Sequence, residues 1–315
     1  MLNCFVIKCL YHIRGLIVLT RHKILHTYVN GNYFVRIYDD GTKVRMGDGD
    51  FEPLFPESID VKITSRCDGG CPMCHENSTP DGRHGDLSLP FFDTLAAGTE
   101  LAIGGGNPLE HPDLVPFLSR MKAQGVVCNI TVRQTHLFAN KDFVQSLIDD
   151  KLVWGVGISF VEASDELLDF VRRNKNCVIH LIAGVHGVDV LEQLADKDLK
   201  ILWLGYKRFG RGEKYYSADV QRKIDELKAV FYDNVDRFAV VSLDNAATEL
   251  FAVKENISRA DFARYYMGDE GTFTMYVDTV DRQFAVNSVT PVKQRQPLHD
   301  NIRTMFGALR GGKIK

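Results

Sequence analysis

The chain has 315 residues, 45% of them hydrophobic, and a formal net charge of −3 at pH 7. This length and composition suffice to bury one large core or two modest ones. The near-neutral charge gives no electrostatic basis for binding nucleic acid or an anionic membrane surface. Seven cysteines without a regular disulfide pattern indicate a reducing compartment, so we expect a cytoplasmic protein.

The first 19 residues are apolar, but Lys8, His12 and Arg14 interrupt them. The uncharged runs between these residues are too short to span a membrane. No small-residue cleavage site follows clearly, which argues against a signal peptide. We expect this segment to be a partly buried extension or the product of an over-long gene start.

A β-hairpin is predicted before the main body of the chain. Residues 34–38 and 42–46 flank Asp39, Asp40 and Gly41, which together form a turn sequence. We therefore assign residues 1–57 to an N-terminal extension that contains this hairpin.

From residue 58 onward, short β-branched segments alternate with helical ones. The predicted strands are 59–64, 101–104, 126–132, 153–159, 177–183 and 200–204. The predicted helices are 114–124, 142–150, 164–174 and 188–196. Such alternation predicts parallel strands joined through βαβ units. We therefore expect an α/β fold in which residues 58–245 form a partial (β/α)6 TIM-type barrel, with its active site at the C-terminal ends of the strands.

Three cysteines lie in the loop that follows the first predicted strand. Cys67, Cys71 and Cys74 form the pattern C-x-x-x-C-x-x-C, with two glycines and a proline between them. These small and rigid residues let the loop wrap tightly, so the three thiolates can converge on one metal centre. A [4Fe–4S] cluster normally takes four thiolates. Three local thiolates leave one iron open, and an open iron predicts chemistry rather than a purely structural site.

A zinc site is the alternative for these cysteines, with His75 or His84 as the fourth ligand. Zinc sites usually pair one C-x-x-C with a second pair some distance away. His75 directly follows Cys74 and is poorly placed to share a tetrahedral ion with it, whereas His84 lies in a plausible loop. A non-enzymatic zinc- or cluster-binding structural module therefore stays open at this point.

With C-x-x-x-C-x-x-C directly after a first strand, the chain resembles the radical S-adenosylmethionine (radical SAM) superfamily. The resemblance implies that the open iron chelates S-adenosylmethionine and that an electron from the cluster cleaves it to methionine and a 5′-deoxyadenosyl radical. It also implies an electron donor such as flavodoxin or ferredoxin. Met73 stands where relatives often have an aromatic residue, and its backbone is expected to contact the cofactor.

Other segments resemble cofactor-binding motifs of the same superfamily. Residues 103–112 resemble its G-G-E-P segment, in which Gly105 and Gly106 are expected to bring the backbone close to S-adenosylmethionine. Asn107 replaces the usual glutamate, so the backbone role is expected rather than a side-chain charge. Two further cofactor contacts are expected at strand ends, Ser159 and Tyr206.

The last quarter of the chain, residues 246–315, resembles in outline the SPASM or twitch extension of many radical SAM enzymes. Residues 271–278 and 283–288 predict a hairpin, and a helix is expected over 301–309. Such extensions normally hold auxiliary clusters through several cysteines, but this chain has none after Cys177. We therefore expect an α+β region without an auxiliary cluster, which closes the barrel mouth over substrate.

The resulting hypothesis is a radical SAM enzyme that abstracts hydrogen from a substrate that the sequence does not identify. A peptide is one candidate, because SPASM-type relatives often modify peptides. The lack of a recognisable leader-binding domain in residues 1–57 argues against it and favours a small metabolite or nucleotide. No catalytic side chain is assigned from the sequence.

Overall fold

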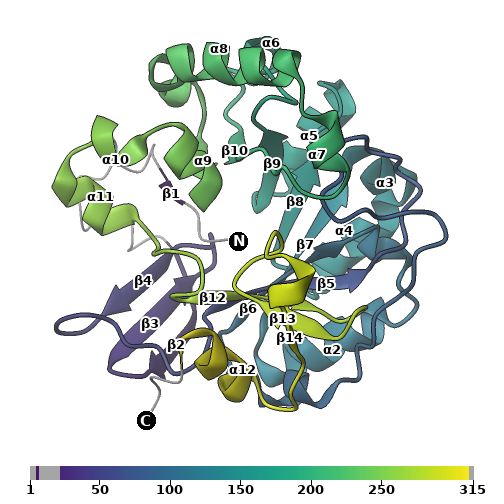
Figure 1. The fold of residues 1–315 in the computed structure, drawn as a ribbon, viewed down its shortest axis with the longest axis vertical. Helices are drawn as coiled ribbons and strands as arrows, with labels where there is room; N and C mark the ends of the chain where they lie inside the picture. The colour runs from purple at the N-terminus through teal and green to yellow at the C-terminus, as the bar shows by residue number, and fades with distance from the viewer. Residues whose placement is uncertain (1–4, 7–21, 312–315) are drawn as a thin grey trace.

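The computed structural model describes residues 5–6 and 22–311 (Figure 1). The extension expected over residues 1–19 therefore lies outside the described residues, apart from the two-residue strand β1 (Phe5–Val6). Within the described ranges, no helix combines the length and the apolar composition needed to cross a bilayer.

A mostly parallel sheet forms the centre of the molecule. All six predicted strands are confirmed, and each is hydrogen-bonded in parallel to the next one along the chain. They are β5 (Ser58–Thr64), β6 (Glu100–Gly105), β7 (Val127–Arg133), β8 (Gly155–Ser159), β9 (Cys177–Ile182) and β10 (Lys200–Leu204). The α/β class is thus confirmed.

The four predicted helices are also confirmed, as α2 (Leu114–Gln124), α4 (Lys141–Asp149), α5 (Asp165–Arg173) and α6 (Val188–Leu194). Local signals set their ends: the Ser164 side chain accepts from the Leu167 amide at the start of α5, and Gly125 adopts φ 80° after α2. Further helices in this part are α3 (Gln134–Ala139), α7 (Arg211–Tyr215) and α8 (Ala218–Asn234). Figure 1 shows α2, α4, α5, α6 and α8 along the outside of the arc of strands.

Along strands β7 to β9, buried apolar side chains alternate with partly buried ones, so the two faces of the sheet differ. In β7, for example, Cys128, Ile130 and Val132 are buried in the main core together with residues of the surrounding helices. Asn129 and Thr131, which alternate with them, lie on the inner face and are only partly buried. Because side chains of a strand alternate between faces, the helices cover an apolar outer face and leave a more polar inner one.

Two short parallel strands extend this sheet beyond the prediction. β11 (Val240–Leu243) pairs with β10, and β12 (Thr274–Asp278) pairs with β5 on the opposite side. The predicted C-terminal hairpin is confirmed, since β12 pairs antiparallel with β13 (Gln283–Ala285), which in turn pairs with β14 (Gln296–Pro297). The predicted last helix is confirmed as α12 (Ile302–Leu309). The division of the chain at residues 57 and 245 stays a prediction.

Short helices connect the strands at the sheet's ends. α9 (Asn245–Leu250), α10 (Val253–Asn256) and α11 (Arg259–Tyr265) follow β11 and lead to β12. Four 3-10 turns complete the elements among the described residues: η1 (Pro90–Thr94), η2 (Pro108–Glu110), η3 (Val235–Arg237) and η4 (Val292–Gln294).

The N-terminal hairpin is confirmed and carries one additional strand. β3 (Tyr33–Tyr38) pairs with β4 (Lys43–Met46) as predicted, and β2 (Ile24–Asn30) pairs with the other side of β3.

This small sheet is tied to the start of β5 through Glu57, whose side chain is 1% exposed. Arg45 donates to both Glu57 oxygens at 2.8 and 3.1 Å, and Tyr33 donates at 2.6 Å. Burial opposes ionisation of Glu57, but Lys43 and Arg45 outweigh it and lower its pKa.

Replacing Glu57 by alanine is expected to lower the free energy of unfolding by about 3–5 kcal/mol, because it leaves the buried Arg45 guanidinium without its carboxylate partner, while Lys43 keeps Glu100 at 2.6 Å. Urea denaturation of the metal-free protein measures this loss. The matched control is the exposed Glu52, for which the change to alanine is expected to cost less than about 0.5 kcal/mol. Equal losses in the two variants would show that the buried ion pair does not hold the small sheet in place.

Candidate metal and cofactor site

The cysteine loop leaves the C-terminal end of β5 and is closed by backbone hydrogen bonds. The Cys67 amide donates to the Thr79 carbonyl at 2.8 Å, and the Thr79 amide donates to the Ser65 carbonyl at 3.1 Å. A tight turn follows, in which the Cys74 amide donates to the Cys71 carbonyl at 3.2 Å. All three thiols are free and partly exposed, so they are available to a metal centre.

The spacing of the three sulfurs distinguishes between a single ion and a cluster. Tetrahedral Zn–S bonds of about 2.3 Å place sulfurs about 3.8 Å apart. Among the described residues, Cys67, Cys71 and Cys74 do not form a group whose ligand atoms all lie within 4.8 Å of one another. In a four-iron cluster each thiolate binds a different iron, which needs a wider separation. Three thiolates suit a cluster, whereas the group of ligand atoms within 4.8 Å that includes Cys67 joins it to Asp68 and His136 and contains one thiolate.

The two histidines considered as zinc ligands have other partners. His75 Nε2 lies 3.4 Å from Glu76 Oε1 and 3.3 Å from Ser288 Oγ. His84 Nδ1 lies 3.0 Å from Thr64 Oγ1. Neither imidazole is placed in a cysteine-containing metal group among the described residues, which further weakens the zinc alternative.

Burial raises the pKa of the Cys67 thiol, and the neighbouring Cys71 and Cys74 raise it further, while the Gly69 amide at 3.3 Å lowers it. Three thiolates on this loop would therefore repel one another in the absence of a cation. A bound metal centre would remove that repulsion, because its positive charge favours the deprotonated thiolates.

Basic side chains from distant segments hold the loop, and the sequence analysis did not assign them this role. Arg211, at the start of α7, donates from Nε to the Cys71 carbonyl at 3.1 Å and from its amide to the Cys74 carbonyl at 3.0 Å. Arg133, at the end of β7, donates to the Gly69 carbonyl. His136 Nε2 lies 2.8 Å from Asp68 Oδ1. In the sequence these residues are marked only by a position at the C-terminal end of a strand or in the segment that follows it.

The Gly-rich segment after β6 packs directly against the entrance to the cysteine loop. The Gly106 amide donates to the Thr64 carbonyl and the Asn107 amide to the Arg66 carbonyl, both at 2.7 Å. A Cβ atom at Gly106 would overlap the Arg66 carbonyl, whereas one at Gly104 would have no atom within 4 Å. Gly105 has φ 109°, a conformation that favours glycine. The close approach at Gly106 is thus between two backbone segments of the protein, and the open space lies at Gly104.

The Asn107 side chain serves the local turn. It is 3% exposed, its Oδ1 accepts from the Leu109 amide at 3.3 Å, and its Nδ2 donates to Glu110 Oε1 at 2.9 Å. Glu110 in turn binds Arg66 at 3.0 Å. Asn107 therefore caps η2 and braces the loop, and its role toward a cofactor stays a prediction.

The other predicted cofactor residues lie at the same edge of the sheet. Ser159 ends β8 and is in register with Arg133 of β7. The Tyr206 hydroxyl donates to the Gly212 carbonyl at 2.7 Å, and the Met73 carbonyl would lie 3.2 Å from a Cβ at Gly212. Met73 and Tyr206 thus both lie close to Gly212 of α7. By contrast, Cys128 and Cys177 lie in the buried core, where burial raises both pKa values to about 12.

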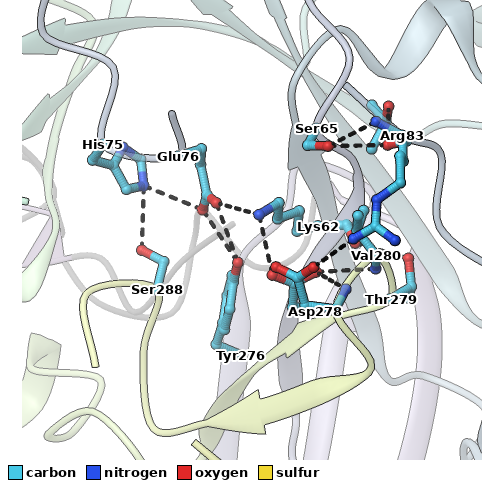
Figure 2. Close-up of polar contacts among 12 residues, drawn as sticks. Lys62, Ser65, His75, Glu76, Arg83, Tyr276, Asp278, Thr279, Val280 and Ser288 are labelled. Carbon is cyan, nitrogen blue, oxygen red and sulfur yellow. Dashed lines mark hydrogen bonds and ion pairs between the residues drawn. The ribbon is translucent and has the colours of Figure 1, made fainter. Parts of the chain in front are cut away.

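A buried network of charged and polar groups lies beside the cysteine loop (Figure 2). Lys62 Nζ, on β5, lies 3.2 Å from Glu76 Oε2 and 3.1 Å from Asp278 Oδ2. The Tyr276 hydroxyl lies 3.3 Å from both Glu76 oxygens. Lys62 and Asp278 are 8% and 0% exposed at the side chain. The network joins β5, the cysteine loop and β12, which are far apart in the sequence.

Each charge in this network stabilises its neighbour. Burial opposes ionisation of Glu76, but the hydrogen bond from His75 and the charge of Lys62 lower its pKa to about 2. Burial likewise opposes the charge on Lys62, yet Glu76 and Asp278 outweigh it and raise the Lys62 pKa. Burial raises the pKa of Tyr276, so its hydroxyl stays protonated and can donate to Glu76. The sequence analysis did not identify this network.

Comparison with known proteins finds the fold but no close relative. No protein-family model matches the chain, and no curated protein matches it in sequence. Crystal structures of SuiB from Streptococcus suis, bound to precursor peptide SuiA or to S-adenosylmethionine, match with a TM-score of 0.56 and 14% identity over 83% of this chain. These matches cover 67% and 68% of the SuiB chains. A further SuiB structure matches with a TM-score of 0.51 and 13% identity, over 78% of this chain and 64% of SuiB.

Replacing Lys62 by methionine is expected to lower the free energy of unfolding by up to about 3–5 kcal/mol, since Glu76 loses its buried lysine partner and Asp278 keeps Arg295 at 3.5 Å. Denaturation in the presence of a chelator measures the metal-free protein. Lys141, which pairs with Glu166 on the surface, is the matched control, and its change to methionine should cost less than about 1 kcal/mol. A Lys62 variant as stable as the Lys141 variant would contradict the structural role of the network.

The Gly106→Ala variant is expected to be less stable by about 1–3 kcal/mol, because the new methyl group overlaps the Arg66 carbonyl and displaces the cysteine loop. Gly104→Ala is the matched control, since the added methyl group enters open space. Thermal unfolding and the rate of proteolysis within residues 65–85 report the two effects. If Gly106→Ala and Gly104→Ala behave alike, the contact between the two backbone segments is looser than described.

Proposed function

We propose that the chain is a radical SAM enzyme that binds one [4Fe–4S] cluster through Cys67, Cys71 and Cys74. The observation that carries this proposal is the C-x-x-x-C-x-x-C loop at the C-terminal end of the first parallel strand, in a fold shared with a protein crystallised with S-adenosylmethionine. When bound, the cluster would supply the electron that cleaves S-adenosylmethionine to methionine and the 5′-deoxyadenosyl radical, which abstracts hydrogen from the substrate. Strands β5–β10 would be the partial (β/α)6 barrel of that superfamily.

The residues of this chain would bind and orient the cofactor. Three cysteines supply three thiolates and leave one position of a four-thiolate site to a ligand from outside the protein. The backbone of Gly105, Gly106 and Asn107 would lie along the methionyl end of S-adenosylmethionine. Met73, Ser159 and Tyr206 would complete its contacts, since all three lie at the same edge of the sheet as the cysteine loop. Arg211 and Arg133 would hold the loop in a fixed shape while the cofactor binds.

A peptide is the substrate that we propose, because SuiB, which shares this fold, was crystallised with its precursor peptide. A small metabolite or nucleotide is the second choice. The C-terminal region from residue 246 would act as a SPASM-like cover without an auxiliary cluster, since the sequence has no cysteine after Cys177. The enzyme would act in the cytoplasm with an electron donor such as flavodoxin or ferredoxin.

Anaerobic reconstitution is expected to give about four irons per chain and, with a reductant, to yield 5′-deoxyadenosine from S-adenosylmethionine. Replacing Cys67, Cys71 and Cys74 together by alanine should abolish both iron and 5′-deoxyadenosine. Cys128→Ala is the matched control and should retain both, because this thiol lies in the buried core. Stoichiometric zinc that survives reconstitution, without cleavage of S-adenosylmethionine, would instead identify a structural metal module.

A further inference from the structure

A cavity of about 900 Å³ opens at the C-terminal ends of the strands. Its walls come from the loop after β10, from residues 244–270 between β11 and β12, which include helices α9 to α11, and from the loop after β13. Lys207, Asp244 and Glu270 supply charges, and Phe262, Tyr266 and Val289 supply apolar surface. A volume of this size accommodates a segment of a peptide rather than a single small group.

The cavity is connected to the cysteine loop through hydrogen bonds. Lys207 Nζ donates to Ser288 Oγ at 3.1 Å, and Ser288 Oγ lies 3.3 Å from His75 Nε2. His75 is the residue next to Cys74. A molecule that contacts Lys207 in the cavity is therefore two hydrogen bonds away from His75 of the proposed cluster loop, and a substrate site requires such proximity.

The walls of the cavity carry an excess of negative charge. Five carboxylate side chains line it against three basic ones; the acidic residues are Asp244, Glu249, Glu255, Asp269 and Glu270, and the basic ones are Lys207, Arg208 and Lys254. Arg208 is already paired with Glu213 at 3.1 Å and stacks over the Tyr216 ring at 4.3 Å. Fewer than three basic side chains are therefore available to offset the charge of the five carboxylates.

A further carboxylate, Asp60, lies on the sheet outside the cavity wall. Asp60 lies on the inner face of β5, two residues before Lys62, and is in register with Tyr276 of β12. Burial raises the pKa of Asp60 to about 6; Lys207 opposes this rise, and Glu270 and Asp244 add to it. The side chain of Asp244 is also buried, and its Oδ1 accepts from the Gly205 and Ala247 amides at 3.0 and 2.7 Å. Carboxylates held together in a partly desolvated space are costly unless a cation joins them.

We infer that this cavity is the substrate site and that it takes a cationic side chain, an ammonium or a guanidinium group, of a peptide. That it is a substrate site rests on the proposed function; its preference for a cation rests on the cavity's own charges. Asp244 and Glu270, which line the cavity, would bind the charged group, while Tyr266 and Phe262 would contact its apolar stem. Asp244 and Glu270 would act as specificity-determining residues.

Three capped tripeptides of equal length test this inference: Gly-Lys-Gly, Gly-norleucine-Gly and Gly-Glu-Gly. Calorimetry with the anaerobically reconstituted full chain and S-adenosylmethionine should show the lysine peptide binding about tenfold more tightly than the norleucine peptide at low salt, which is the effect of one partly desolvated ion pair. The glutamate peptide should bind most weakly. Equal affinity for the lysine and norleucine peptides, or tighter binding of the glutamate peptide, would overturn the inference.

Two variants locate the effect. Asp244→Asn, which keeps a side-chain oxygen to cap α9, and Glu270→Gln should each reduce the preference for lysine over norleucine by at least about threefold, whereas Glu226→Gln on the exposed surface of α8 should leave it unchanged. Glu270 is exposed, so its variant keeps the test valid even if Asp244→Asn does not fold. A preference that survives in Glu270→Gln and in a folded Asp244→Asn would show that the peptide binds elsewhere.

The proposed function is tested separately, by 5′-deoxyadenosine formation in the absence of any peptide. A protein that cleaves S-adenosylmethionine but does not prefer the lysine peptide would sustain the proposed function and reject the cationic substrate. A protein that prefers the lysine peptide but does not cleave S-adenosylmethionine would identify a cation-binding cavity on a chain that is not a radical SAM enzyme.

Discussion

The ion network centred on Lys62 is the constraint on which the geometry of the cysteine loop depends. A lysine that is 8% exposed needs anionic partners, and these come from Glu76 in the loop and Asp278 on β12. An unpaired charge in this place would cost several kcal/mol. The network can therefore be satisfied only when β12 lies against β5 and the loop folds back over both strands, as Figure 2 shows.

A comparable arrangement lies at the other end of β5. Glu57 and Glu100 accept from Lys43 and Arg45, which belong to the small N-terminal sheet. The first parallel strand is thus fixed at both ends by buried charges from segments outside the six-strand series. This double attachment gives the cysteine loop a rigid base, and it explains how a loop with few apolar side chains keeps three thiols on one side of the strand ends.

Local patterns in the sequence were enough to predict the main elements. Strands β5–β10 are apolar segments of five to seven residues, and helices such as α5 begin at a clear capping residue, Ser164. The position of Cys67 just after β5 also followed directly, because parallel strands place all their C-terminal ends at one edge. The strand β11 was missed since four residues, Val240–Leu243, carry too little periodic signal.

The sequence by itself determined the alternation of strands and helices and the three cysteines with their spacing, since both are properties of adjacent residues. Only the tertiary structure decided that β12 joins the sheet beside β5, with Lys62 bonded to a residue 216 positions away. It also decided that Arg211 holds the cysteine loop, that Gly106 approaches Arg66, and that five acidic residues between β11 and β12 line one cavity. Such contacts depend on which distant segments the fold brings together. Neither the hydrophobic periodicity of a segment nor its residue types specify which other segment it will contact.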